Sequence, residues 1–234
     1  MRFKNMLIGS VMRRLGTAAL APYRLSVREG HFRSSLLGRA VGRDGRAVPW
    51  YTYPAIDFLR TRDFSTKRIL EFGSGQSTLW WSERAHQVVS VEEDLAWASY
   101  VEGRKGGNVV LQHIPVPANL DRSLRTGIAA LDVKHVEPVQ DFLRSVGGKY
   151  DVIIIDGHMR PELLMIAFDW LKPSGAIILD NAEGYHFWDI LQGRGCRRFD
   201  FFGFAPGVSK QHCTAVVFVE DCFLLDVKAP IPTA

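Results

Sequence analysis

Cysteines are few in this chain of 234 residues, and long apolar runs and internal repeats are absent. The three cysteines, Cys196, Cys213 and Cys222, are odd in number and lack Cys-x-x-Cys spacing, which argues against a disulfide framework or a zinc site. No uninterrupted apolar run approaches the ~18 residues that a membrane-spanning helix requires. These absences predict a chain that works in a reducing, cytoplasmic compartment.

The positive charge is concentrated at the N-terminus. Residues 1–50 contain ten Lys or Arg and two acids, whereas the rest of the chain contains 19 basic and 23 acidic side chains. The net charge of +4 therefore combines a basic extension of +8 with a remainder of −4. We expect residues 1–49 to form a helical extension that ends in a linker at 41–49, and residues 50–234 to form one domain.

The extension has the periodicity of an amphipathic helix. Its apolar residues recur at three- and four-residue intervals, and they are Leu7, Ile8, Val11, Met12, Leu15, Ala18 and Ala19. Such a helix would pack on the domain or on a second copy in a homodimer, or it would lie on an anionic membrane surface through residues 1–24. Nucleic acid is not expected, because no aromatic residues interleave with the charges.

The segment 67–94 predicts a strand, a glycine turn, a helix and a second strand. Residues 69–72 form a buried apolar strand, Gly73, Ser74 and Gly75 form the turn, and the second strand, 87–91, ends at Glu92. In this arrangement a carboxylate at the end of the second strand binds the hydroxyls of a ribose. The unit therefore predicts a nucleoside site.

Two ligands compete for this site. A dinucleotide fold uses Gly-x-Gly-x-x-Gly to approach a pyrophosphate, but the third glycine is absent here, because residues 76–78 are Gln, Ser and Thr. Glu71, just before the turn, would repel a pyrophosphate and favour an ammonium or sulfonium group. The sequence favours the cationic ligand, and a nicotinamide-dependent oxidoreductase is the alternative.

These residues resemble the first motif, Glu/Asp-x-Gly-x-Gly, of the class I S-adenosylmethionine-dependent methyltransferases. The resemblance covers about residues 50–220. It implies an α/β, doubly wound Rossmann-like fold with a mainly parallel seven-stranded sheet. It also implies cofactor contacts: the methionine end of S-adenosylmethionine would lie against Glu71, Gly73 and Gly75, and its ribose would be held by Glu92. Ser74 and Ser77 would also bind the cofactor.

Strands and helices alternate along the rest of the chain, which predicts a mainly parallel sheet covered on both faces. The further predicted strands are 108–114, 150–155, 176–179 and a terminal antiparallel pair, 197–202 and 214–219. The further predicted helices are 55–62, 139–146 and 161–171.

Polar residues follow the fourth and fifth predicted strands. Asp156, Asp180 and Asn181 would supply three oxygen ligands for Mg²⁺, which would bind the acceptor hydroxyl and lower its pKa. This trio resembles the metal site of catechol O-methyltransferase-like enzymes, but Met159 stands where that family has a lysine base. His158 is the nearest substitute as a base, and strand-end carboxylates without a metal are the alternative.

The sequence as a whole predicts transfer of a methyl group from S-adenosylmethionine to a hydroxyl of a small molecule or sugar. We expect His158 and Asp156 to be catalytic, with Mg²⁺ at Asp156, Asp180 and Asn181. A nicotinamide-dependent oxidoreductase and a non-catalytic nucleoside-binding partner subunit are the alternatives. Trp50 and Trp188 are among aromatic residues that would either line the acceptor site or complete the core.

Overall fold

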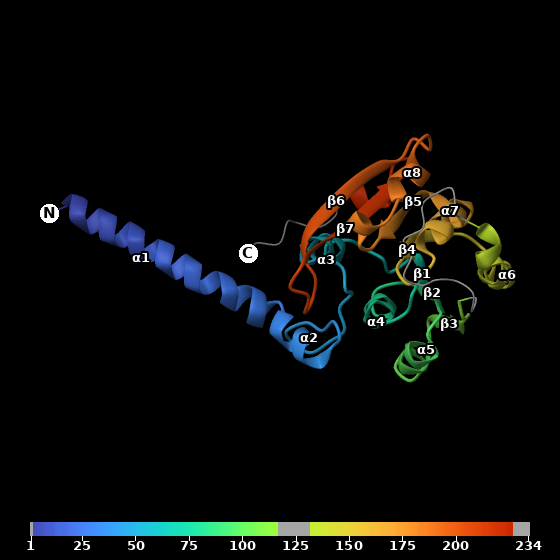
Figure 1. The fold of residues 1–234 in the computed structure, drawn as a ribbon, viewed down its shortest axis with the longest axis horizontal. Helices are drawn as coiled ribbons and strands as arrows, with labels where there is room; N and C mark the ends of the chain where they lie inside the picture. Colours follow the sequence, from blue (N-terminus) through green and yellow to red (C-terminus); the bar gives the residue numbers. More distant parts are fainter. Residues whose placement is uncertain (1, 117–131, 227–234) are drawn as a thin grey trace.

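The computed structural model describes residues 2–116 and 132–226, with side chains from residue 11 onward in the first helix. Seven strands form one sheet in the order β3-β2-β1-β4-β5-β7-β6 (Figure 1). The strands are β1 Arg68–Phe72, β2 Gln87–Glu92, β3 Val109–His113, β4 Tyr150–Ile155, β5 Leu171–Leu179, β6 Arg197–Phe204 and β7 Gln211–Phe218. Strands β1 to β5 pair in parallel, and β7 runs antiparallel to both β5 and β6.

Helices follow most of the parallel strands. The helices are α1 Arg2–Tyr23, α2 His31–Leu37, α3 Tyr53–Arg60, α4 Gln76–Ser82, α5 Leu95–Glu102, α6 Glu137–Val146, α7 Arg160–Trp170 and α8 Phe187–Leu191. Short single turns are η1 Arg24–Arg28, η3 Val133–Val136, η4 Ala182–Gly184 and η5 Phe223–Leu225.

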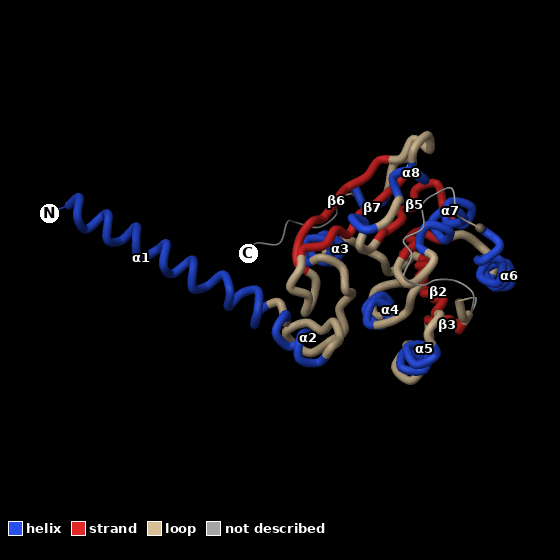
Figure 2. Tube along the Cα trace, in the orientation of Figure 1, coloured by secondary structure: helices blue, strands red, loops and turns tan. Residues whose placement is uncertain are grey.

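The two faces of the sheet carry separate hydrophobic cores. Figure 2 shows the helices that cover the sheet on either side. Leu70 and Phe72 of β1 pack with residues of α6, α7 and α8 on one face. Ile69 packs with residues of α3 and α4 on the other face, where the tryptophans 80 and 81 of α4 are buried. Alternation along β1 places the side chain of Glu71 on this second face.

The doubly wound, mainly parallel seven-stranded sheet that the sequence predicted is confirmed. The strand at 150–155 and the terminal antiparallel pair also form as predicted, within a few residues. Strand β5 begins at Leu171, five residues before the predicted start, because Leu171 pairs with Tyr150 ahead of a register shift. Most of the stretch 115–135, for which the sequence predicted no element, lies outside the described residues.

The N-terminal region divides into a projecting helix and an anchored segment. Helix α1 extends away from the domain and continues directly into the π-helical turn η1 (Figure 1). The expected linker at 41–49 is instead a folded turn, in which Val41 pairs with Ala47 and Val48 is buried in the core beside α3 and α4. Among residues 2–116 and 132–226, no helix is long and apolar enough to cross a bilayer.

The turn after β1 touches the end of β4, and a glycine is required there. Gly73 has φ +91°, and a Cβ at this position would lie 2.6 Å from the backbone oxygen of Asp156. At Gly75 a Cβ would meet nothing within 4 Å.

We predict that Gly73→Ala lowers the free energy of unfolding by about 2–4 kcal/mol, because it combines a left-handed backbone with a clash against backbone atoms. Gly75→Ala is the matched control and should change the free energy of unfolding by less than about 1 kcal/mol. Urea unfolding followed by circular dichroism measures both. Equal stability of the two variants would contradict the close approach as the reason for glycine.

Candidate functional site

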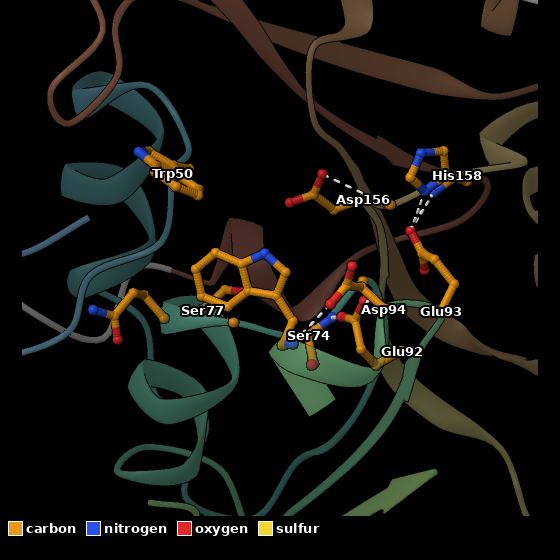
Figure 3. Close-up of a pocket in the computed structure, with 13 residues that line it drawn as sticks. Trp50, Ser74, Ser77, Glu92, Glu93, Asp94, Asp156 and His158 are labelled. Carbon is orange, nitrogen blue, oxygen red and sulfur yellow. Dashed lines mark hydrogen bonds and ion pairs between the residues drawn. The ribbon is translucent and has the colours of Figure 1, made fainter. Parts of the chain in front are cut away.

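A cavity of about 290 Å³ lies at the carboxyl ends of β1, β2 and β4 (Figure 3). In parallel sheets this edge is where ligands bind. The lining residues are Trp50, Gly73, Ser74, Gly75, Gln76, Ser77, Glu92, Glu93, Asp94, Trp97, Asp156, Gly157 and His158. The structure therefore brings together most of the residues that the sequence predicted for the cofactor.

Glu92 joins the end of β2 to the glycine turn. One carboxylate oxygen accepts a hydrogen bond from the backbone N–H of Ser74, and the other accepts one from the backbone N–H of Asp94 at 2.8 Å (Figure 3). Each carboxylate oxygen can accept more than one hydrogen bond, so both can still accept a ribose hydroxyl. Glu92 lines the cavity at the end of β2, the position at which the sequence predicted a carboxylate that would bind a ribose.

Glu71 does not line the cavity, which corrects its expected place at the methionine end. Its side chain is fully buried beneath the turn, where the hydroxyls of Thr78 and Ser90 donate to the same carboxyl oxygen. Burial raises the pKa of Glu71 to about 8. The alternation of side chains along β1 explains this placement, since Glu71 shares a face with Ile69 rather than projecting from the strand end.

The side chains that line the cavity are acidic. Its lining includes four carboxylic acids, namely Glu92, Glu93, Asp94 and Asp156, and among the described lining residues there is no Lys or Arg. Burial raises the pKa of Glu92, as expected where carboxylates gather in a partly enclosed space. Such a lining favours a ligand with a cationic group and disfavours a pyrophosphate.

Glu93 and His158 form a pair at one side of the cavity (Figure 3). A carboxylate oxygen of Glu93 contacts Nδ1 of His158 and also accepts the backbone N–H of His158 at 3.0 Å. The carboxylate therefore selects the tautomer that carries the proton on Nδ1, which leaves a lone pair on Nε2. A histidine in this state can accept a proton from a hydroxyl.

Arg160 joins the loops that follow β4 and β5. Its guanidinium is paired with Asp156 at 2.6 Å, and it donates to the backbone oxygen of Asp180 at 2.6 Å and to Oδ1 of Asn181 at 3.2 Å. It also donates to the backbone oxygen of Gly157 at 2.9 Å. Burial works against the charge of Arg160, but the neighbouring carboxyl groups of Asp156 and Asp180 raise its pKa overall.

The expected magnesium site is not formed by these residues. The side chains of Asp156 and Asn181 instead accept hydrogen bonds from the guanidinium of Arg160. Arg160 also donates to the backbone oxygen of Asp180, whose carboxyl group accepts a hydrogen bond from the hydroxyl of Thr214 at 3.1 Å. A divalent cation at the same place would therefore meet a fixed positive charge. Burial, followed by the charge of Asp156, raises the pKa of Asp180 to about 8. Within residues 2–116 and 132–226, no three His, Cys, Asp or Glu residues are grouped to hold a metal ion.

Two tryptophans contribute the apolar wall of the cavity. Trp50 and Trp97 meet edge to face, with ring centroids 6.3 Å apart. The indole N–H of Trp50 donates to the backbone oxygen of Pro206 at 2.9 Å, which fixes the ring against the loop between β6 and β7. Aromatic faces of this kind can stack on a sugar or a planar ring.

The sequence missed three features of the site. Glu93 follows Glu92 directly, but its contact with His158 joins residues 65 positions apart. Trp97 lies on α5, where no motif marks it. Arg160 is permanently charged, so from the sequence it could bind only an anionic part of a substrate, and it is instead buried against carboxyl and carbonyl oxygens.

Comparison with solved structures identifies the fold. The structure is similar to the O-methyltransferase from Bacillus cereus in complex with SAH, with a TM-score of 0.54 and 17% identity over 86% of this chain and 97% of that chain. It is similar to cofactor-bound Rv0187 from MTB, with a TM-score of 0.52 and 16% identity over 87% and 95%. It is also similar to the O-methyltransferase TomG from Streptomyces achromogenes in complex with SAM, with a TM-score of 0.50 and 16% identity over 83% and 87%.

The chain has the Rossmann-like fold of class I methyltransferases, as its resemblance to that family predicted. No family model and no curated protein matches the sequence. At the identities found, the likeness establishes the architecture, and the chemistry must be argued from the cavity itself.

The buried carboxyl of Glu71 makes a testable contribution to stability. Its pKa is raised from 4.5 to about 8, so between these pH values the native state keeps a proton that the unfolded state has released. The free energy of unfolding therefore falls as the pH rises through this window. Glu71→Gln cannot ionise, and we predict that it loses less stability than the wild type between about pH 5 and pH 8, by on the order of 3 kcal/mol.

Urea unfolding at the two pH values measures this difference. Glu102→Gln, an exposed acid at the end of α5, is the control and should keep the wild-type dependence on pH. The same dependence on pH in Glu71→Gln and the wild type would show that Glu71 is ionised in the native state.

Proposed function

We propose that the chain transfers a methyl group from S-adenosylmethionine to a hydroxyl oxygen of a small-molecule or sugar acceptor. One observation carries the proposal: an acid-lined cavity at the carboxyl edge of a methyltransferase-type sheet places Glu92 beside the Glu93–His158 pair. Glu92 would hold the ribose, and the glycine turn at 73–75 would accommodate the methionine part of the cofactor.

When bound, S-adenosylmethionine would supply the methyl group: the acceptor oxygen forms a bond to the methyl carbon as the carbon–sulfur bond breaks and its electron pair returns to sulfur. The protein aligns the two reactants and accepts a proton. Nε2 of His158 takes the proton of the acceptor hydroxyl, and the carboxylate of Glu93 stabilises the resulting imidazolium. The acids of the cavity favour the cationic sulfonium before transfer over the neutral thioether after it.

The acceptor would lie near the tryptophan wall. Trp50 and Trp97 line the same cavity as His158, and stacking on their faces would orient a ring that carries the reacting hydroxyl. A hydroxyl needs a base to become a good nucleophile, whereas a carboxylate does not. The histidine in the cavity is therefore the reason for proposing a hydroxyl rather than a carboxylate as the methyl acceptor.

Variants of two site residues test the assignment. We predict that His158→Gln lowers kcat for transfer from labelled S-adenosylmethionine to a pool of hydroxylated acceptors by about 10²–10⁴-fold, because it removes the base. It should leave binding of S-adenosylhomocysteine, measured by calorimetry, within about twofold of the wild type, because Glu92 and the glycine turn are intact. Glu92→Ala should weaken that binding by about tenfold or more.

His212→Gln is the matched control. His212 is paired with Glu183 at 2.9 Å near the start of β7 and does not line the cavity, so its variant should keep both binding and transfer. Loss of transfer in His212→Gln but not in His158→Gln would move the base to the other pair. Binding of S-adenosylhomocysteine without transfer to any acceptor would favour a non-catalytic nucleoside-binding subunit, and tighter binding of NAD would favour an oxidoreductase.

Because Arg160 bonds the side chains of Asp156 and Asn181, two of the expected metal ligands, we predict transfer that does not need a divalent cation. Activity in EDTA should stay within about twofold of activity in Mg²⁺, and calorimetric titration with Mn²⁺ should show no site at this edge of the sheet. Loss of activity in EDTA that Mg²⁺ restores would show that the cation displaces the guanidinium.

A further inference from the structure

The largest apolar surface that the domain does not cover lies at the N-terminus. Half of the large apolar side chains exposed in the described residues belong to residues 11–37, namely Val11, Met12, Leu15, Leu20, Tyr23, Val27, Phe32, Leu36 and Leu37. Apolar patches of this density on a protein surface mark sites of interaction. Five of these side chains, at positions 11, 12, 15, 20 and 23, lie on α1, which projects away from the domain (Figure 1).

Three of these side chains share one face of α1. Val11 and Leu15 are four residues apart, and Met12 precedes Leu15 by three, so all three lie on neighbouring turns of the same side. They are 47%, 60% and 64% exposed for Val11, Leu15 and Met12 respectively. We call these three residues the α1 apolar face. Most of the stability of a helix in a protein comes from packing such a face, and the part of the chain that the structure describes leaves these three side chains exposed.

The charge around this face has one sign. Residues 1–28 contain six Lys or Arg and no Asp or Glu, and the first acid is Glu29. Arg14 and Arg24 are exposed on α1 and η1. Two copies of this helix packed together would bring like charges close with no acids to pair them, which disfavours a helix–helix dimer. A nucleic acid would pair the arginines but would leave the apolar side chains in water.

An anionic lipid surface satisfies both features, since its acyl region takes apolar side chains and its phosphates take cations. We propose that α1 and η1 dock the protein on anionic membranes, with the α1 apolar face inserted among the lipids and the flanking arginines at the headgroups. The helix lies in the plane of the surface and does not span the bilayer. This docking does not depend on the proposed chemistry, because it concerns a different part of the chain.

The root of this region is fixed to the domain, so docking would also orient the cavity. The hydroxyl of Ser35 in α2 donates to the backbone oxygen of Gly207 at 3.1 Å, and the ring of His31 contacts the hydroxyl of Tyr53 at 3.4 Å. Both contacts tie α2 to elements next to Trp50, which lines the cavity.

Co-sedimentation of the full chain with vesicles tests the proposal. We expect binding to vesicles of phosphatidylcholine mixed with phosphatidylglycerol, weaker binding to phosphatidylcholine alone, and a fall in binding as salt is raised. Val11→Glu combined with Leu15→Glu, and separately Arg14→Glu combined with Arg24→Glu, should each reduce the bound fraction by about tenfold or more at limiting lipid.

Matched controls change the same chemistry elsewhere. Phe202→Glu removes an exposed apolar side chain from β6, and Arg144→Glu combined with Arg197→Glu removes two exposed cations from the domain. These controls should bind as the wild type does, and circular dichroism confirms that every variant is folded.

Three results would overturn the proposal. They are no sedimentation of the wild type with anionic vesicles, equal binding to neutral and anionic vesicles, and wild-type binding by both α1 variants. A wild-type dimer in sedimentation equilibrium that Val11→Glu with Leu15→Glu disrupts, without any vesicle binding, would instead assign the face to a second copy of the chain.

Discussion

The hydrogen bonds of the buried Arg160 guanidinium hold together the loops at the carboxyl edge of the sheet. The guanidinium joins the loop after β4, through Asp156 and Gly157, to the loop after β5, through Asp180 and Asn181. A charge taken out of water needs such a set of partners, and removal of one side of a buried pair leaves the other uncompensated. Because the glycine turn after β1 rests directly on the backbone of Asp156, this pairing also supports the floor of the cavity.

Local environment separates the roles of the carboxyl groups around the cavity. Glu71 is enclosed beneath the turn, where burial favours its neutral form more than the hydroxyl donors favour its anion, and it belongs to the core. Glu92, the last residue of β2, receives backbone N–H groups and faces the cavity. Glu93 is turned toward His158. Three acids close in space thus have different environments, because burial and hydrogen bonds differ at each.

The division of charge along the chain corresponds to a division in space. The acidic cavity lies at the carboxyl edge of the sheet. The cationic, apolar α1 lies beyond α2 and projects away from the domain (Figure 1). Residues 1–28 contain six Lys or Arg and no Asp or Glu, so the helix carries cations and apolar side chains together. The projecting helix is therefore suited to a surface outside the chain.

The sequence alone determined the architecture and the position of Glu92 at the end of β2. Strand and helix periods, the glycine at 73 and the acid that ends β2 are local features, readable within about thirty residues, and they predicted the βαβ unit and the position of Glu92. The alternation of side chains along β1 also indicates that Glu71 shares the buried face of Ile69, although the motif alone suggested that Glu71 contacts the cofactor.

Only the tertiary structure decided which charged groups meet. Asp156, Asp180 and Asn181 have the chemistry of metal ligands, and nothing in the linear pattern shows that Arg160 bonds the side chains of Asp156 and Asn181 and the backbone of Asp180. The pairing of Glu93 with His158 joins the loops that follow β2 and β4, and these strands lie on either side of β1 in the folded sheet. Secondary structure follows from backbone hydrogen bonds between near neighbours, whereas electrostatic pairing follows from the packing of distant loops, and that packing decides the chemistry of this site.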